Sequence, residues 1–145
     1  MSTVRDIIRK KGSDVWSISP EASVYEAIQL MAEKDAGALL VMSGDEVNGI
    51  LSERDCVRRV DLQERTSHAT KVNEIMTREV ISVPVNEKLE DCMATMLEKN
   101  IRHLPVYEGT ELLGLISVRD VLREVVEVQK SLIAQLERFI TGGGR

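Results

Sequence analysis

The stretch GILSERD at Gly49–Asp55 returns as GLISVRD at Gly114–Asp120, and this repetition decides the fold. A shift of 65 residues aligns Val15–Val60 with Val80–Val125 without a gap, and identities are spread along the whole window. Internal similarity at a fixed spacing indicates a structural unit that is present twice. A single sheet-and-helix unit leaves one sheet face uncovered, so we expect the two copies to pack together.

Each copy predicts the same order of elements, β-α-β-β-α. A short strand comes first, VWSI at 15–18 or VISV at 80–83. A helix follows, because apolar residues recur at i, i+3, i+4 and i+7, namely Val24, Ala27, Ile28 and Met31 or Leu89, Cys92, Met93 and Met96. Ser23 with Glu26 forms a capping-box pattern at the first helix, and Asn86 is the expected cap of the second. Two buried strands around a glycine turn then lead into the repeated heptapeptide, which opens another helix.

The duplication sets the expected boundaries. VRDII at Val4–Ile8 resembles VNEIM at Val72–Met76, so the repeats cover residues 4–65 and 72–129. Residues 130–145 extend the last helix and end in a flexible tail, TGGGR. The extension keeps an apolar stripe, formed by Val121, Leu122, Val125, Val128, Leu132, Leu136, Phe139 and Ile140. The stripe either meets a partner, in which case we expect a homodimer, or folds back on its own protomer.

Composition narrows the function. The 145 residues carry a net charge of −5, and 43% of them are hydrophobic. An acidic chain without a basic stripe is not expected to bind nucleic acid, and no apolar run has the length of a membrane span. Without a signal peptide, a cytoplasmic location is expected. The two histidines and two cysteines form no cluster with metal-ligand spacing and no catalytic constellation, so neither a metal site nor an enzyme is expected.

The repeated heptapeptide has a structural and a functional interpretation. Ser52 with Asp55, and Ser117 with Asp120, match the pattern of a helix cap. Arginine in the first helical turn is disfavoured by the helix dipole, yet it occurs in both copies. Free amides at a helix start, a serine hydroxyl and an arginine together favour a phosphate, while the aspartate suits ribose hydroxyls. The pattern therefore also predicts two nucleotide sites.

These stretches, with SISP and SVPV on the first strands and IRHLPVY on the second, resemble tandem CBS domains, also called a Bateman module. The resemblance covers residues from about Val4 to about Val128. It implies an α/β fold of two β-α-β-β-α repeats related by pseudo-two-fold symmetry, plus the extended C-terminal helix. It also implies two clefts that hold an adenosine-containing ligand such as AMP, ADP, ATP, NAD or S-adenosylmethionine.

The resemblance assigns roles to residues. Asp55 and Asp120 take the ribose hydroxyls, and Ser52 and Ser117 contact ribose or phosphate. Basic residues reach across from the other repeat to hold phosphate. The remaining expected contacts are Arg102, His103 and Arg119 for the cleft of Asp55, Arg54 for the cleft of Asp120, Ile50 and Leu115 beside adenine, and Thr77 to Val80 as a further wall.

The two clefts are not expected to be equal. The second repeat has Arg102-His103-Leu104-Pro105 where the first has Gly37-Ala38-Leu39-Leu40. His103 is alternatively an ordinary strand histidine, and Arg102 a solvated arginine. The expected function is a regulatory, signal-sensing module that binds an adenine nucleotide and acts on an unidentified partner protein. The alternatives are an oligomerisation module without ligand and an enzyme of unknown class.

Overall fold

A computed structural model describes residues 2–12 and 14–143, which form two compact units. Unit 1 comprises Met1–Asp14 together with Ser82–Arg145, and unit 2 comprises Val15–Ile81. The repeats in the sequence and the units in space therefore differ. Residues 2–12 precede the first strand of the first repeat but belong to unit 1, and residues 70–81 precede the first strand of the second repeat but belong to unit 2. These are the leading segments, and each packs with the strands of the other repeat.

Unit 2 contains a three-stranded sheet with the order β1-β2-β3. Strand β1 runs parallel to β2, and β2 runs antiparallel to β3. The elements of unit 2 are β1 (Ser17–Ile18), α2 (Val24–Lys34), β2 (Ala38–Ser43), β3 (Glu46–Ser52), α3 (Glu53–Cys56), η1 (Val57–Asp61) and α4 (Val72–Ile75). The expected order β-α-β-β-α is confirmed, but only two residues of VWSI pair with β2, so the first strand is shorter than predicted.

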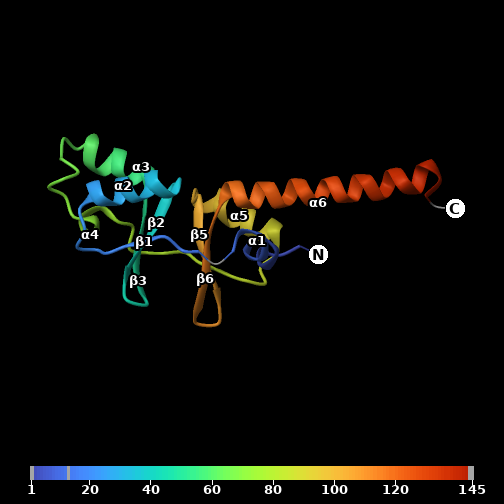
Figure 1. Cartoon of the computed structure of the whole chain (residues 1–145), viewed down its shortest axis with the longest axis horizontal. Helices are drawn as coiled ribbons and strands as arrows, with labels where there is room; N and C mark the ends of the chain where they lie inside the picture. Colours follow the sequence, from blue (N-terminus) through green and yellow to red (C-terminus); the bar gives the residue numbers. More distant parts are fainter. Residues whose placement is uncertain (1, 13, 144–145) are drawn as a thin grey trace. The chain divides into compact units, whose positions relative to one another are not determined.

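Unit 1 repeats this topology with the sheet order β4-β5-β6. Figure 1 shows the hairpin of β5 and β6. Its elements are α1 (Val4–Lys11), β4 (Val83–Pro84), α5 (Leu89–Lys99), β5 (His103–Glu108), β6 (Glu111–Ser117), α6 (Val118–Arg138) and η2 (Phe139–Gly143). Even local details recur. The β-bulge between Val41 and Met42 returns between Val106 and Tyr107, and the helices α2 and α5 both end on a left-handed residue, Asp35 or Asn100.

The leading segments bind to the start of the first long helix of each unit. In unit 2, the N–H of Val24 donates to Thr70 O at 2.8 Å, and the predicted capping box of Ser23 and Glu26 is present. In unit 1, the N–H of Leu89 donates to Ser2 O at 3.3 Å. The expectation that Asn86 caps α5 is wrong, because the N-cap residue is Lys88 and the N-terminal segment supplies the acceptor for the first amide.

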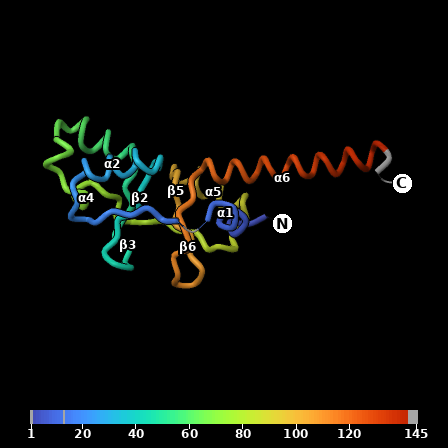
Figure 2. The backbone as a smooth tube through the Cα atoms, in the orientation of Figure 1, coloured from blue at the N-terminus to red at the C-terminus, as the bar shows by residue number. Residues whose placement is uncertain are grey.

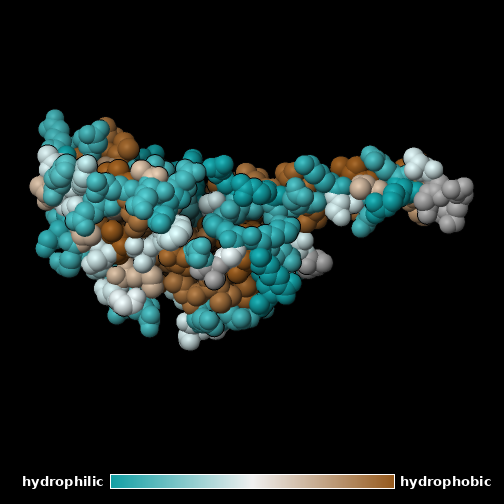
Figure 3. All heavy atoms as spheres, viewed as in Figure 1, coloured by the Kyte–Doolittle hydropathy of each residue, from teal (hydrophilic) through white to brown (hydrophobic). Residues whose placement is uncertain are grey.

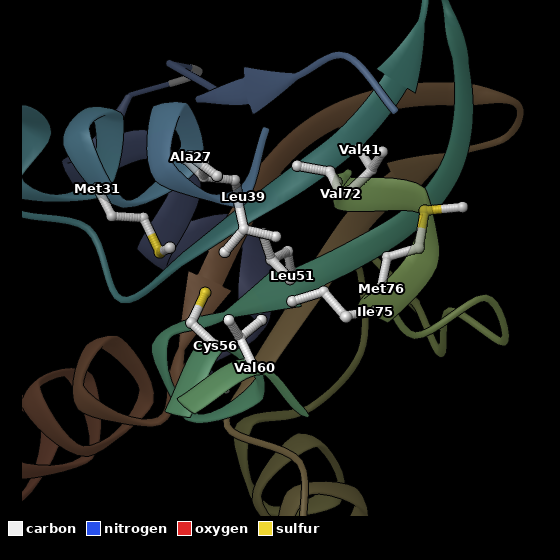
Figure 4. Close-up of a cluster of buried hydrophobic side chains, with 11 residues drawn as sticks. Ala27, Met31, Leu39, Val41, Leu51, Cys56, Val60, Val72, Ile75 and Met76 are labelled. Atoms are coloured by element: carbon white, nitrogen blue, oxygen red, sulfur yellow. The ribbon is translucent and has the colours of Figure 1, made fainter. Parts of the chain in front are cut away.

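The core of unit 2 lies between its sheet and its helices. Figure 4 shows buried side chains from α2, β2, β3, α3, η1 and α4 converging there. Burial raises the pKa of Cys56, in this core, and of Cys92, on α5, to about 11, so both thiols stay protonated at neutral pH. Both cysteines behave as small buried hydrophobic residues.

Helix α6 continues 21 residues without a reversal. Val121, at the start of the apolar stripe, is buried, but the stripe beyond the second repeat stays exposed (Figure 3). Leu132, Ile133 and Leu136 keep 54%, 54% and 53% of their surface, and Phe139 keeps 72%. The alternative in which this extension folds back on its own protomer is therefore wrong. Residues 141–143 of the expected flexible tail TGGGR belong to the helical segment η2 (Phe139–Gly143), and residues 144 and 145 lie outside the described residues.

Along the described residues, no helix combines the length and the apolar character that a membrane span requires.

Candidate functional site

The two heptapeptides cap helices α3 and α6 in the same way. In unit 2, the N–H of Asp55 donates to Ser52 Oγ at 3.2 Å, and the N–H of Ser52 donates to Asp55 Oδ2 at 2.9 Å. In unit 1, the N–H of Asp120 donates to Ser117 Oγ at 3.3 Å, and the N–H of Ser117 donates to Asp120 Oδ2 at 2.8 Å. The capping interpretation is confirmed in both copies. Each cap uses one carboxylate oxygen, Oδ2, and leaves Oδ1 to other partners.

The same helix starts offer fewer amides than the sequence argument assumed. The first amide of α3, on Glu53, donates to Gly37 O at 3.0 Å, and the first amide of α6, on Val118, donates to Arg102 O at 2.9 Å. The third amide of each helix is taken by the capping serine. These helix starts therefore do not provide a phosphate-binding site made mainly of free amides. A bound phosphate would depend on side-chain donors.

In unit 2, the segment after α4 lies against the end of β3. The N–H of Ile50 donates to Thr77 O at 3.0 Å, and the N–H of Thr77 donates to Ile50 O at 2.9 Å. Ile50 and Thr77, which were both predicted as site residues, therefore lie side by side, two residues before the capping Ser52. Val80 lies three residues further along this segment and is half-buried.

The glycine of each heptapeptide allows this close packing. A Cβ atom on Gly49 would lie 2.7 Å from Thr77 O and 2.9 Å from Met76 Sδ. A Cβ atom on Gly114 would lie 2.9 Å from Ile8 Cδ1, on α1. Both glycines therefore let the leading segment approach the strand. Both glycines stand in the repeated heptapeptide, but the sequence pattern alone does not indicate this role.

In unit 1, a lysine takes the place that Thr77 has beside Ile50 in unit 2. Helix α1 lies beside β6 and the start of α6 (Figure 2). Its last residue, Lys11, donates from Nζ to Leu115 O at 2.8 Å and to Asp120 Oδ2 at 2.7 Å. Leu115, which is buried, and Asp120 are both predicted site residues. Lys11, which was not predicted, links them. The run Arg9-Lys10-Lys11, which has no counterpart before the second repeat, was the signal available in the sequence.

Arg102 and His103 lie beside the heptapeptide of their own repeat. His103 is paired with Ser117 across β5 and β6, and it is half-buried. Burial lowers the pKa of His103 to about 4, and the charge of Lys11 acts in the same direction. At neutral pH, His103 is therefore an uncharged hydrogen-bonding group next to Asp120, while Arg102 is exposed.

The carboxylate of Asp120 is ionised at neutral pH. Burial raises its pKa, but hydrogen bonds from Lys11 and from the backbone and hydroxyl of Ser117 outweigh burial and hold the pKa below the usual value. The side chains of Asp55 and Asp120 keep 17% and 12% of their surface. Both carboxylates are therefore partly sheltered from water and still reachable.

Arg54 and Arg119 lie in the first turns of α3 and α6. Within the described part of each unit, no carboxylate lies within salt-bridge distance of either arginine. Their positive charges, which capping does not explain, stay available to an anion. In residues 2–12 and 14–143, no group of three or more His, Cys, Asp or Glu side chains is arranged to hold a metal ion.

Comparisons with known proteins agree with this architecture. The family model for the CBS domain matches residues 4–62 and 72–127. The chain is 34% identical to the Arabidopsis thaliana protein named "CBS domain-containing protein CBSX3, mitochondrial", over 98% of this chain and 73% of that protein. A solved protein with CBS domains from Burkholderia ambifaria is 46% identical, with a TM-score of 0.84 over 87% of this chain and 95% of its own.

A more distant structure shares the fold. The CBS domain pair of protein MJ0100, solved with 5′-methylthioadenosine and S-adenosyl-L-methionine, is 21% identical, with a TM-score of 0.76 over 88% of this chain and 98% of its own. The duplicated heptapeptides, the two repeated sheets and these matches lead to one conclusion: the chain belongs to the CBS-domain family.

Proposed function

We propose that the chain is a regulatory module that binds an adenosine-containing ligand, such as AMP, ADP, ATP, NAD or S-adenosylmethionine. The observation that carries the proposal is the pair of aspartates. In Asp55 and Asp120, the helix cap engages Oδ2, and an arginine nitrogen lies 3.9 or 3.8 Å from Oδ1. A sheltered carboxyl group with an oxygen outside the cap suits the two hydroxyls of a ribose.

The neighbouring residues suit the rest of such a ligand. Ile50 on β3 and Leu115 on β6 are the apolar residues proposed beside adenine, and Thr77 to Val80 are proposed as a further wall. Phosphate would be held by side chains, because most of the first helical amides are engaged. The side chains proposed for this role are Arg54, Arg102, His103 and Arg119. The adenosine compounds in the MJ0100 domain pair make this ligand class the first to test.

We further propose that the ligand acts by linkage and that the chain has no catalytic activity of its own. A ligand that binds one arrangement of the repeats better than another shifts the population toward that arrangement. A partner protein then reads the shift. We propose a cytoplasmic location, although the Arabidopsis relative is mitochondrial by name.

Thermal unfolding with each adenosine compound tests the ligand proposal. Mass spectrometry of the purified protein first shows whether a nucleotide is already bound. A ligand at one hundred times its Kd is expected to stabilise the nucleotide-free protein by about 2.7 kcal/mol. Asp55→Asn and Asp120→Asn should each reduce this gain and together abolish it, while Asp45→Asn, in an exposed turn, should leave it unchanged. If none of the compounds raises the Tm, the proposal fails; turnover of a nucleotide would instead indicate an enzyme.

The exposed face of α6 favours a second function, self-association through this helix. Residues of this face recur every three or four positions, at Leu122, Val126, Gln129, Ile133, Leu136 and Ile140, a spacing that suits helix pairing. Lys130 and Glu137 lie two helical turns apart along one edge of the face. In an antiparallel pair, each Lys130 would lie opposite the partner's Glu137, so we propose that a second copy of this chain covers the face.

Light scattering tests this dimer. The wild-type protein should have the mass of two chains, and Ile133→Glu with Leu136→Glu should have the mass of one. Ser131→Glu, on the polar side of α6, is the matched control and should remain a dimer. Lys130→Glu should weaken the dimer, and the exchange Lys130→Glu with Glu137→Lys should restore it. A wild-type mass of one chain would remove the proposal.

A further inference from the structure

The end of helix α1 places an ammonium group on the proposed ribose acceptor of unit 1. Lys11 Nζ lies 2.7 Å from Asp120 Oδ2 and 2.8 Å from Leu115 O. The lysine side chain keeps 39% of its surface and the aspartate side chain 12%. The contact is therefore not a fully solvated ion pair, whose contribution would be small; it is anchored by a second acceptor on a buried strand.

The acceptor at Asp120 is already crowded. Oδ2 receives the N–H of Ser117 at 2.8 Å, its hydroxyl at 3.1 Å and the ammonium of Lys11. An ionised carboxyl group offers about four acceptor positions on its two oxygens, or about two for each oxygen. A ligand that engages both oxygens must therefore displace a donor from Oδ2. The Ser117 donors belong to the cap of α6, so Lys11 is the donor that leaves.

Unit 2 has no such ammonium. The carbonyl of Ile50, which corresponds to that of Leu115, is bonded by the backbone N–H of Thr77 at 2.9 Å. In the described part of unit 2, the nearest cation to Asp55 is Arg59, with Nε 3.9 Å from Oδ1. A ribose at Asp55 therefore displaces no cation, whereas a ribose at Asp120 does.

Lys11 can move without the release of α1. The neighbouring Lys10 donates from Nζ to both oxygens of the buried Glu124, at 2.9 and 3.2 Å, and Val4 and Ile7 of α1 are buried. The helix stays attached through these contacts while the flexible four-carbon stem of Lys11 swings away. The displaced ammonium then needs another anion, which a phosphate supplies and an uncharged nucleoside does not.

We infer that Lys11 is a specificity-determining residue of the unit 1 site: it fills Asp120 when the site is empty and makes this site, but not the Asp55 site, select phosphorylated nucleosides over uncharged ones. This inference rests on the proposed function. The matched control residue is Arg9, an exposed cation in the last turn of the same helix.

A measurement without ligand tests the contact alone. Because the Lys11 ammonium stabilises the ionised carboxylate, Lys11→Met should raise the pKa of Asp120, measured by carbon NMR of the labelled carboxyl group. Arg9→Met should not change it. An unchanged pKa in Lys11→Met would show that Lys11 does not occupy Asp120 in solution and would overturn the inference, whatever the protein binds.

A binding measurement tests the selectivity. Titration calorimetry with AMP and with adenosine is performed on Asp55→Asn protein, in which only the Asp120 site keeps its aspartate. Lys11→Met should bind adenosine more tightly and AMP less tightly. The Kd for adenosine divided by the Kd for AMP should therefore fall about tenfold or more, which corresponds to a loss of about 1.4 kcal/mol of discrimination. Arg9→Met should keep the ratio of the parent.

The outcomes separate the two proposals. A ratio that is unchanged by Lys11→Met, or lowered equally by Arg9→Met, overturns the role of Lys11. AMP binding to the wild-type protein that is lost completely in the Asp55→Asn parent also overturns it, and the proposed function stands. No binding of either compound to nucleotide-free wild-type protein overturns the role of Lys11, and the thermal test with all five adenosine compounds then decides the proposed function.

Discussion

The two units carry matching heptapeptides, with the same Gly, Ser, Arg and Asp, but attach their leading segments by different contacts. In unit 2, α4 has four residues, and the chain after it pairs with β3 by two backbone hydrogen bonds between Ile50 and Thr77. In unit 1, α1 has eight residues, and the lysine at its end reaches Leu115 O instead. The backbone pairing of Thr77 with Ile50 in unit 2 is thus replaced in unit 1 by a hydrogen bond from the charged side chain of Lys11.

The charges around the two helices that follow the heptapeptides are also exchanged. Arg59 of unit 2 donates to Ile75 O, at the end of α4, at 2.8 Å. The corresponding residue of unit 1 is Glu124, which is buried and accepts from Lys10 of α1. In unit 2 the cation lies on the repeat, and in unit 1 it lies on the leading helix. Heptapeptides that share Gly, Ser, Arg and Asp therefore give sites of different charge, because the charge comes from the segments that pack against them.

The largest expected difference between the units concerns the glycines. Gly49→Ala places a methyl group against the backbone oxygen of Thr77, which cannot move without breaking its pairing with Ile50. Overpacking of this kind costs about 2 to 3 kcal/mol. Gly114→Ala meets only the end of the Ile8 side chain, which can change its rotamer, so the cost is about 1 kcal/mol or less. Urea unfolding of the two variants measures both values.

A double variant sharpens this comparison. Ile8→Val removes the methyl group that a Cβ atom on Gly114 would meet, so it should relieve part of the cost of Gly114→Ala. Equal destabilisation by Gly49→Ala and Gly114→Ala would contradict the view that the two leading segments are fastened differently.

The next effect is a dependence of stability on pH that His103 of unit 1 provides. The pKa of His103 is lowered to about 4 by burial and by Lys11, against about 6.5 in an unfolded chain. Between these values the unfolded chain binds more protons, so stability is lost as the pH falls from about 6.5 to about 4. The expected loss at pH 5 is about 2 kcal/mol relative to pH 8.

The first repeat supplies the control for this pH effect. Ala38 pairs with Ser52 as His103 pairs with Ser117, so His103→Ala gives unit 1 the residue of unit 2. The free energy of unfolding of this variant, measured by urea titration at pH 8, 6.5 and 5, should depend less on pH in this range. The same loss in the variant as in the wild-type protein would show that His103 is not its source.

How much of the fold and of the candidate site can be predicted depends on how far apart the contacting residues are in the sequence. The order of elements and the caps of Ser52 and Ser117 follow from spacing within one segment, and they are confirmed. The cap of α5 was missed because its first amide bonds to Ser2, far away in the sequence. Lys11 was missed for the same reason, since its partner Asp120 belongs to the other repeat. The residue roles taken from the family resemblance stay predictions.

A smaller and equal effect is expected from the two capping serines. Ser52→Ala and Ser117→Ala each remove the acceptor for the third amide of a helix, which costs about 1 kcal/mol. Because both caps have the same geometry, urea unfolding should give the same loss within a few tenths of a kcal/mol. Ser43→Ala, at the exposed end of β2, is a serine outside the caps. A much larger loss for one capping serine would show that its hydroxyl has a further structural role.

The smallest expected effect tests the exchange of charges at Arg59. Arg59→Met removes the hydrogen bond to Ile75 O, and because the arginine side chain keeps 49% of its surface, water replaces the donor and the loss is about 0.5 to 1 kcal/mol. Arg59→Glu installs the unit 1 residue without its lysine partner and adds repulsion from Asp55, so it should destabilise more than Arg59→Met. Arg58→Met, on an exposed neighbour, is the control. If Arg59→Glu proved no worse than Arg59→Met in urea unfolding, the charge at this position would not depend on the leading segment packed against it.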